Sequence, residues 1–327
     1  MAVTALADLI QREEFRVAVQ LESLRRSVFY STGVIVPDAN LKAMMDAGNG
    51  VDFAFDYFDS LPDTASNVSD DSATLATANK ITTKQDLAIA LERNNAWGSK
   101  DINAMQSTTG DPMNAIINSV AAYWGRQIDI LALATVKGVK ADNIANDSGD
   151  MVYDNGGVPA LITIQQVNSC KQTMGDARSA LKMFICHSAI VTALQNAGVT
   201  SSVYSDQGEY LYETLMGLAI MESDNVESTA TDTYISYLMG AGALAFGERM
   251  PKVPSELYRN PATGNGGGEE TLWSRKCFSI HPVGFQFVKA GIAGNTPTNA
   301  ELEAAAQWDR IRDRKYIKMA FLEAKSV

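Results

Sequence analysis

The sequence predicts an α+β fold, and three observations lead to that prediction. Between residues 111 and 140, apolar residues recur at steps of three and four, which is typical of a long amphipathic helix. From Val51 to Tyr57, apolar and polar residues alternate, which is typical of a strand with one apolar face. The predicted helices and strands follow each other without the regular strand–helix–strand repeat of a doubly wound sheet.

Length, composition and charge limit the class of protein. The 327 residues are enough for one large domain or two modest ones with a sizeable core. The net charge of −11 and the pI of about 4.7 argue against a primary role in binding nucleic acid, which needs clustered Lys and Arg. An acidic surface still allows the protein to enclose nucleic acid, because it would repel the nucleic acid and not hold it.

The cysteines and the N-terminal residues predict a soluble protein made in the cytoplasm. The three cysteines, Cys170, Cys186 and Cys277, are odd in number and have no CxxC spacing, as expected of reduced intracellular thiols. Charges from Arg12 onwards come too early for a secretory signal. No apolar run approaches the roughly 18 residues of a membrane span.

The first elements predicted are a helix, an extended piece and a long hairpin. Residues 1–30 favour a helix, residues 32–36 an extended piece that ends at Pro37, and residues 48–50 a break. The alternation that starts at Val51 returns over residues 87–91, and the polar stretch between them has little to bury. We therefore expect an arm that projects from the body. Its aromatic face needs another surface to cover it, most simply a neighbouring subunit.

The long helix is predicted to run from Asp111 to about Lys140. Asp111 suits the N-cap because its carboxylate accepts the free N–H groups of the first turn, and Pro112 suits the first helical position. Gly138 is the expected C-cap. At about 1.5 Å per residue the helix is roughly 40 Å long, and we expect a C-terminal strand to pack against it. Its apolar face consists of Met113, Ile116, Ile117, Val120, Trp124, Ile128, Leu131 and Val136.

The rest of the chain is predicted to mix helices and strands. Residues 141–157 are dense in Asp, Asn and Gly and are expected to form a loop. Thr298 and Glu301 form a capping box that starts a short helix over residues 299–306. The other expected elements are helices at 164–174 and 188–197, strands at 181–186, 234–246 and 311–322, a linker at 251–254, a turn at 260–268, and two strands around Pro282 within 271–288.

The sequence predicts no catalytic site, no cofactor-binding site and no metal site. Cys186 and His187 are adjacent, so on a strand they point to opposite faces and cannot form a nucleophile–base pair. Cys277 and His281 remain a pair in principle, although chance explains their proximity in sequence better. No residues have the spacing of zinc ligands.

Three further stretches have simpler explanations than ligand binding. The acidic loop with Asp142, Asp147, Asp150 and Asp154 lacks the spacing of a calcium loop and is expected to be solvated. Residues 240–247 and 264–268 lack the complete dinucleotide and P-loop patterns, so we expect close backbone packing in the first and a flexible turn in the second. A basic cluster near the C-terminus alternates with acids and is expected to form salt bridges, including bridges between subunits. Its members are Arg310, Arg312, Arg314, Lys315 and Lys318.

A series of stretches in fixed order carries a resemblance that spans almost the whole chain. They are Ser31–Val36, Lys80–Lys84, Arg93–Trp97, Gly110–Met113, Met183–Ser188, Tyr234–Phe246, Gly266–Leu272, Ile280–Gly284, Thr296–Leu302, Trp308–Arg310 and Asp313–Ile317. No single motif is diagnostic, but their order and spacing are hard to obtain by chance. Together they resemble the major capsid (head coat) proteins of tailed bacteriophages, which have the Hong Kong 97-type fold.

The resemblance implies a division of the chain and a function. The implied parts are an N-arm at 1–50, an extended loop (the long hairpin) at 51–97 over a neighbouring subunit, a peripheral domain at 98–157 and 251–327 with a spine helix at about 112–138, and an axial domain at 158–250. The implied function is that of a structural protein of the virion, made in the host cytoplasm. It self-assembles as pentamers and hexamers into an icosahedral shell around double-stranded DNA, without catalysis and without a cofactor.

The resemblance also implies partners. These are other copies of the chain, a scaffold protein, a portal protein and, in some members, decoration proteins; the DNA is enclosed without sequence-specific binding, and no membrane is involved. Because no long helical leader precedes the N-arm, we expect a separate scaffold protein or removal of a leader before Met1. Some members crosslink a lysine of the extended loop to a neighbour; Lys80 and Lys84 are the candidates, and nothing in the sequence fixes the partner.

Two other hypotheses stay open. The shell protein of a bacterial cargo-holding nanocompartment shares this fold, although the long polar loop favours the virus. A soluble enzyme of an unrelated class would instead be a monomer or a small oligomer and would depend on an essential acid, His or Cys.

Overall fold

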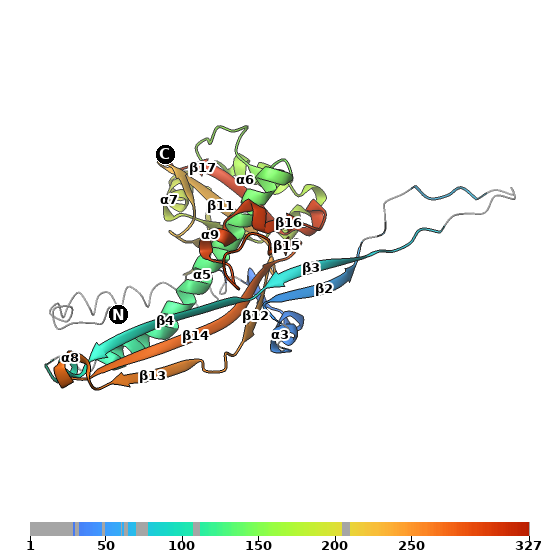
Figure 1. Cartoon of the computed structure of the whole chain (residues 1–327). Helices are drawn as coiled ribbons and strands as arrows, with labels where there is room; N and C mark the ends of the chain where they lie inside the picture. The colour runs from blue at the N-terminus through green and yellow to red at the C-terminus, as the bar shows by residue number, and fades with distance from the viewer. Residues whose placement is uncertain are drawn as a thin grey trace.

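The structure is a computed structural model, and it describes residues 29, 33–47, 50–59, 61, 65–69, 78–106, 112–204 and 210–326. Figure 1 shows a body built around one long helix, with an arm that projects to one side and a sheet that extends to the other. Asp111, the expected N-cap, lies outside the described residues, as does all of the expected N-terminal helix except Phe29.

The long helix α5 (Pro112–Asn146) is the central element of the body. It begins at Pro112, as the sequence predicts, and its second half enters the main core, where Leu131, Val136 and Val139 are buried. It continues to Asn146, so the loop predicted from residue 141 begins later than expected. Within the described part of the chain, no helix combines the length and the apolar character needed to cross a membrane.

Gly138 lies inside α5, so the prediction that it caps the helix is wrong. A Cβ atom at Gly138 would lie 2.0 Å from the carbonyl oxygen of Leu302 and 2.4 Å from Nε1 of Trp308. The glycine therefore lets α9 (Asn299–Leu302) and β16 (Trp308–Arg310) approach the backbone of the helix. This packing outweighs the helix-propensity cost of a glycine, which is about 1 kcal/mol.

A five-stranded sheet forms one side of the body and reaches away from it (Figure 1). Its long strand β14 pairs with β4 on one side and with β12 and β13 on the other. The bounds of its strands are β1 (Ile35–Pro37), β4 (Leu91–Lys100), β12 (Leu244–Arg249), β13 (Ser255–Asn260) and β14 (Glu269–Pro282).

Helices cover both faces of this sheet. Ser274 of β14 accepts a hydrogen bond from Trp124 of α5, whereas Cys277 packs in a cluster with Leu41 and Met45 of α3 (Ala39–Asp46). Residues three apart on a strand point to opposite faces, so α5 and α3 lie on opposite faces of the sheet. The sequence analysis did not predict α3, whose N-cap is Asp38.

An eight-stranded sheet forms the second unit, and α6 (Ile164–Gln172) and α7 (Ser188–Asn196) pack on it around a separate core. Both helices match the predicted ranges within two residues at each end. The strands are β5 (Val152–Tyr153), β6 (Met183–Cys186), β7 (Ser201–Tyr204), β8 (Tyr210–Leu215), β9 (Leu218–Glu222), β10 (Ser228–Ala230), β11 (Thr233–Met239) and β17 (Met319–Lys325).

The single strand predicted over residues 234–246 is two strands in two different sheets. β11 ends at Met239 in the eight-stranded sheet, and β12 starts at Leu244 in the five-stranded sheet. Between them, Gly242 has φ +68°, and a Cβ atom at Gly240 would lie 2.6 Å from the carbonyl oxygen of Ala180. The glycines therefore form the crossing between the two sheets, where positive φ and a close backbone approach are both required.

The C-terminal strand also differs from the prediction. β17 covers residues 319–325 and pairs with β11 over its whole length, with Thr233 opposite Lys325 and Met239 opposite Met319. The segment that packs against α5 comes earlier, in α9 and β16. The capping box at Thr298 and Glu301 is confirmed, because each residue's side chain accepts from the other's backbone N–H.

The arm is a two-stranded antiparallel sheet of β2 (Asp52–Phe58) and β3 (Thr83–Ile89), as predicted. In Figure 1 it leaves the body on the side away from α8 (Thr263–Gly266). Shorter elements complete the chain: β15 (Phe285–Phe287), which pairs with β16, α4 (Asp101–Gln106), and 3₁₀ turns at Gly175–Ala180, Ala305–Gln307 and Arg314–Tyr316.

Candidate assembly surfaces

The strand β2 of the arm is fixed to the body by polar contacts with residues of the C-terminal part of the chain. The hydroxyl of Tyr57 donates to the carbonyl oxygen of Ile311 at 3.2 Å, and the guanidinium of Arg312 lies 4.4 Å from the centre of the Tyr57 ring. Nζ of Lys289 lies 2.8 Å from the carboxylate of Asp52. These contacts set the direction in which the arm leaves the body.

A buried histidine joins the arm to the five-stranded sheet. Nε2 of His281 in β14 lies 3.0 Å from Oδ1 of Asp86 in β3, and the imidazole stacks on Phe55 of β2. His281 is 6% exposed and Asp86 8% exposed, so the contact is shielded from water. Cys277 lies four residues away on the same strand, roughly 13 Å along it, and packs in the cluster with Leu41 and Met45, so the two residues do not form a nucleophile–base pair.

Beyond its base, the arm exposes apolar side chains. Phe58 is 72% exposed, Leu61 69%, Val68 91% and Ile81 51%. Large apolar side chains that cluster on a projecting element mark a surface for another protein. Lys84, a candidate for crosslinking, lies 2.7 Å from Asp59 across the arm.

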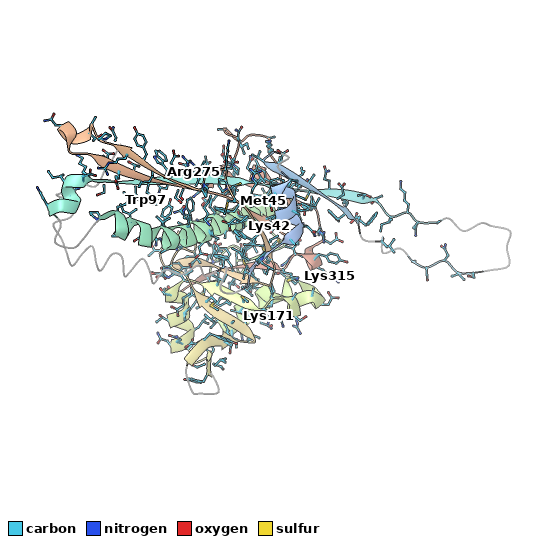
Figure 2. All side chains as sticks on the ribbon, turned by 90° about the horizontal axis from the view of Figure 1, so that it is seen from below. Lys42, Met45, Trp97, Lys171, Arg275 and Lys315 are labelled. Atoms are coloured by element: carbon cyan, nitrogen blue, oxygen red, sulfur yellow. The ribbon has the colours of Figure 1, made fainter. Side chains whose placement is uncertain are left out.

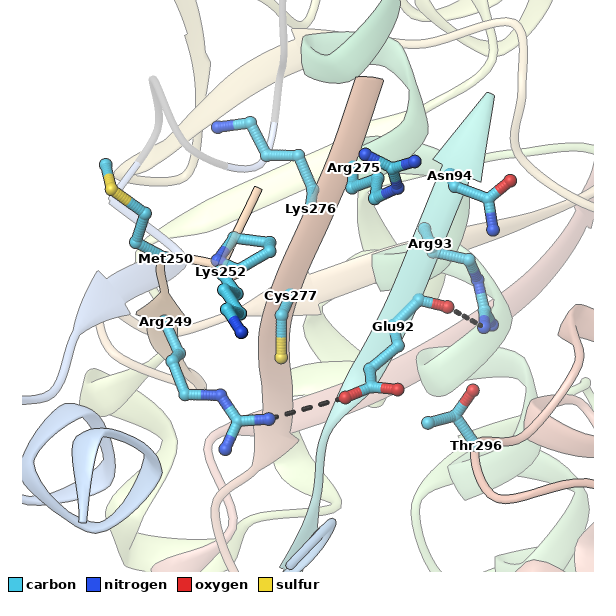
Figure 3. Close-up of a pocket in the computed structure, with 11 residues that line it drawn as sticks. Glu92, Arg93, Asn94, Arg249, Met250, Lys252, Arg275, Lys276, Cys277 and Thr296 are labelled. Atoms are coloured by element: carbon cyan, nitrogen blue, oxygen red, sulfur yellow. Dashed lines mark hydrogen bonds and ion pairs between the residues drawn. The ribbon is translucent and has the colours of Figure 1, made fainter. Parts of the chain in front are cut away.

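A second candidate surface is a groove of about 510 Å³ where β4, β12 and β14 meet (Figure 3). Its cations are Arg93, Arg249, Lys252, Arg275 and Lys276. Sequence reasoning missed this groove, because its residues come from four separate parts of the chain, and only the fold brings them together.

Three carboxylates neutralise part of the groove. Arg249 binds Glu92 at 3.3 Å, Arg275 binds Glu256 at 3.0 Å, and Lys276 binds Glu248 at 2.8 Å.

The other two cations of the groove, Arg93 and Lys252, form no ion pair with a described carboxylate. Arg93 donates to the carbonyl oxygens of Pro297 and Glu92, and burial lowers the pKa of its guanidinium. Lys252 is exposed and has no ion-pair partner among the described residues.

Two members of the basic cluster near the C-terminus, Arg310 and Lys315, form salt bridges within the chain. Arg310 binds Asp147 at 3.2 Å and Asp150 at 2.8 Å, so two acids of the predicted solvated loop are ligands of an arginine. Lys315 binds Asp176 at 3.0 Å. Arg314 donates to Ile317 and Thr173, and burial lowers the pKa of its guanidinium to about 10.

The histidine and cysteines of the eight-stranded unit have structural roles. Nδ1 of His187 accepts from the N–H of Ala189 and caps α7, and its ring stacks on Tyr234. Burial raises the pKa of the Cys170 thiol to about 12 and that of Cys186 further, which makes both thiols poor nucleophiles. No group of three or more metal-ligating side chains occurs among the residues that the structure describes.

The two glycine-rich stretches show the close packing and the turn that the sequence predicts. A Cβ atom at Gly247 would lie 2.8 Å from Cγ of Leu41 and 2.9 Å from Sδ of Met45, so this glycine lets α3 pack closely on β12. Gly264, Gly266 and Gly268 have positive φ values and form the turn between β13 and β14.

Comparisons with known proteins agree with this architecture. The family described as Gp13-like, major capsid protein 13-like, matches residues 42–318. The major capsid protein of Bacillus phage SPP1 is 32% identical over 325 residues, which cover 98% of this chain and 97% of that protein.

Two solved structures share the fold at low sequence identity. The cyanophage Pam1 capsid has a TM-score of 0.54 and 10% identity, with 92% of this chain and 93% of that chain covered. The capsid of the native GTA particle, computed with C5 symmetry, has a TM-score of 0.51 and 11% identity, with 91% and 90% covered. The fold is therefore the Hong Kong 97-type fold of phage capsids, as the resemblance implied. Since the family match spans most of the chain and the SPP1 relative aligns over nearly all of it, the chain belongs to the Gp13-like family of major capsid proteins of tailed bacteriophages.

Proposed function

We propose that copies of this major capsid protein assemble as pentamers and hexamers into an icosahedral head that encloses double-stranded DNA. The observation that carries the proposal is the arm, whose side chains Phe58 and Val68 are 72% and 91% exposed on an element that leaves the body. Such a surface is stable in water when another copy covers it. The excess of acid, −11 per chain, suits a wall that holds DNA without binding it tightly.

The proposed role is mechanical. The Gp13-like family consists of structural capsid proteins, and its members are virion components. We infer that the chain has no catalytic turnover and is made in the host cytoplasm. Its proposed partners are a scaffold protein, a portal protein and decoration proteins.

The proposed division of the chain follows the resemblance, with three changes suggested by strand pairing. The N-arm is residues 1–50, the extended loop begins at 51, and α5 is the spine helix of the peripheral domain. The axial domain is expected at residues 158–250, but because β12 pairs with β14, we assign residues 244–250 to the peripheral domain. Because β4 pairs with β14, we assign residues 91–97 to the peripheral domain. Because β17 pairs with β11, we assign residues 319–325 to the axial domain.

Electron microscopy of particles purified from infected cells, with extraction of their contents, tests the proposal. Shells that contain double-stranded DNA support it. Shells that contain an enzyme and no DNA would favour a cargo-holding nanocompartment. Discrete dimers, with no pentamers, hexamers or shells, would overturn it.

A further inference from the structure

One end of the eight-stranded sheet carries four cations. Lys182 directly precedes β6 and Lys318 directly precedes β17, and these two strands flank the end of β11. Lys171 lies in the last turn of α6, and Arg178 lies in the 3₁₀ turn that contacts α6. The four side chains come from four segments of the chain, and together they form a cation cluster.

The two lysines of the sheet point towards the face that α6 covers. Met183 and Met319, the residues that follow them, pack against the main core, on the other face. Neighbouring residues on a strand point to opposite faces, so Lys182 and Lys318 point to the face where α6 packs around the second core.

The 3₁₀ turn lies directly beside Lys318. A Cβ atom at Gly240 would lie 2.9 Å from Cβ of Lys318 and 2.6 Å from the carbonyl oxygen of Ala180, the last residue of the turn. Arg178 and Lys182 lie two residues to either side of Ala180. All four cations are therefore at the same end of the sheet.

The charges of the cation cluster are not neutralised within the described part of the chain. None of the four side chains forms an ion pair there, and the nearby carboxylate of Asp176 binds Lys315 at 3.0 Å. Figure 2 shows Lys171 and Lys315 in the same part of the molecule. Burial lowers the pKa of Lys171, and the charges of Arg178 and Lys182 lower it further. An anion at the cluster would relieve this repulsion.

The opposite end of the same sheet is acidic. Glu222 ends β9, Asp232 directly precedes β11, and Glu323 lies near the end of β17. Charge is thus separated along the sheet, in a chain with a net charge of −11. A large anion is attracted to one end only and repelled by the other.

The side chains of the cluster suit phosphate groups better than a protein surface. Three of the four cations are lysines, which are depleted in the cores of protein–protein interfaces. The neighbouring residues Gln172 and Ser179 are exposed and polar. Lys and Arg, together with Ser and Gln, are the side chains that contact the phosphates of DNA.

We propose that the cation cluster contacts the phosphate backbone of double-stranded DNA. The proposal rests on the proposed function and names the place at which an enclosed duplex touches the chain. Because the rest of the acidic chain repels the duplex, the contact is weak, independent of sequence and sensitive to salt. With four phosphates neutralised, the logarithm of the association constant falls with the logarithm of salt concentration with a slope of about −3.6.

Fluorescence anisotropy of a labelled short duplex with the full-length chain tests the proposal. Lys182→Gln is expected to weaken binding about tenfold at about 50 mM salt and to make the slope shallower by about 0.9, because one phosphate contact is lost. Lys182→Arg keeps the charge and is expected to bind within about twofold of the wild type. The matched control is Lys325→Gln, an exposed lysine at the acidic end of the sheet, which is expected to bind as the wild type does.

Thermal unfolding of each variant shows whether it is folded. A folded wild-type chain that does not bind the duplex at about 20 mM salt overturns the proposal, and so does an equal loss of binding in Lys325→Gln and Lys182→Gln. Tighter binding of polyglutamate than of the duplex would assign the cluster to an acidic protein and overturn the proposal as well. The proposed capsid function stands in all three cases, and it fails only if particles from infected cells contain no double-stranded DNA.

Discussion

Gly138 is the residue at which a single methyl group has the largest expected effect on packing. Gly138→Ala places Cβ 2.0 Å from the carbonyl oxygen of Leu302, which is a backbone atom and cannot turn aside. We expect the free energy of unfolding to fall by about 1–3 kcal/mol, the usual cost of overpacking a core. Denaturant unfolding of the purified variant measures the change.

Gly125 provides the matched control in the same helix. A Cβ atom there has no heavy atom within 4 Å, so Gly125→Ala meets no obstacle. Alanine is the better helix former by about 1 kcal/mol, and this variant is expected to be slightly more stable than the wild type. Equal effects of the two substitutions would show that the contact at Leu302 does not constrain the fold.

Asp142 is expected to make stability depend on pH. It is fully buried in α5, where Oδ1 accepts from Asn146 at 2.6 Å and Oδ2 has no hydrogen-bond partner among the described residues. Burial raises the pKa of this carboxyl above its ordinary value of 3.8, and the neighbouring Asp147 and Asp309 act in the same direction. The folded chain then holds this proton more tightly than the unfolded chain, so the stabilisation is present below the ordinary pKa and is lost as pH rises through the folded-state pKa.

Asp142→Asn removes this titration. We expect the variant to be more stable than the wild type at neutral pH, with the difference disappearing as pH falls below the ordinary value of 3.8. Denaturant unfolding across this range measures it, and Asp313→Asn, at an exposed position, is the control. A variant less stable than the wild type at neutral pH would mean that the carboxylate form of Asp142 is needed.

Among the elements, the contact between α5 and β14 depends most on one side chain. Trp124 is 5% exposed, and its Nε1 donates to Oγ of Ser274 at 2.9 Å. Trp124→Ala is expected to cost about 3–5 kcal/mol by leaving a cavity, and to abolish assembly if α5 is the spine of the subunit. Trp124→Phe keeps most of the volume and loses one hydrogen bond, at about 1 kcal/mol, and is expected to assemble. Normal shells from the alanine variant in electron microscopy would contradict the spine assignment.

The elements that the sequence predicts well are those fixed by local signals. Pro112 sets the start of α5, the Thr298–Glu301 box starts α9, and alternation defines the two strands of the arm. The helix α3 has two signals in the sequence, the N-cap Asp38 and the four-residue spacing of Leu41 and Met45. It has only eight residues, so its apolar pattern is weak.

The remaining elements depend on contacts between distant residues. β4 contains Arg93, Asn94 and Asn95 and has no clear alternation, and it is a strand because β14 pairs with it. Gly138 lies inside α5 because α9 packs where a side chain would be. After β11 the chain turns at Gly240 because the next strand, β12, belongs to the five-stranded sheet. The groove also depends on such contacts, since none of the four segments that line it is distinctive alone.

At the scale of the whole molecule, the body and the arm tip have separate tasks. Three hydrophobic clusters hold the body together, and the arm contributes Phe53 and Ala88 from its base to the third of them. None of the described residues between 59 and 81 belongs to a cluster. Folding of the body and assembly of copies are therefore expected to be separable by changes in the tip.

Replacing residues 60–81 with a short Asn-Gly turn between β2 and β3 tests this separation. Asn-Gly suits a two-residue hairpin connection, and the anchors at Tyr57, Asp86 and His281 are kept. We expect the thermal unfolding of the variant to match that of the wild type, because none of the described residues of the removed segment packs in a hydrophobic cluster. We expect no shells in electron microscopy, because the exposed apolar and acidic tip is what a neighbouring copy would bind. Shells at the wild-type yield would show that the tip is dispensable for assembly, and early unfolding would show that it is part of the folded core.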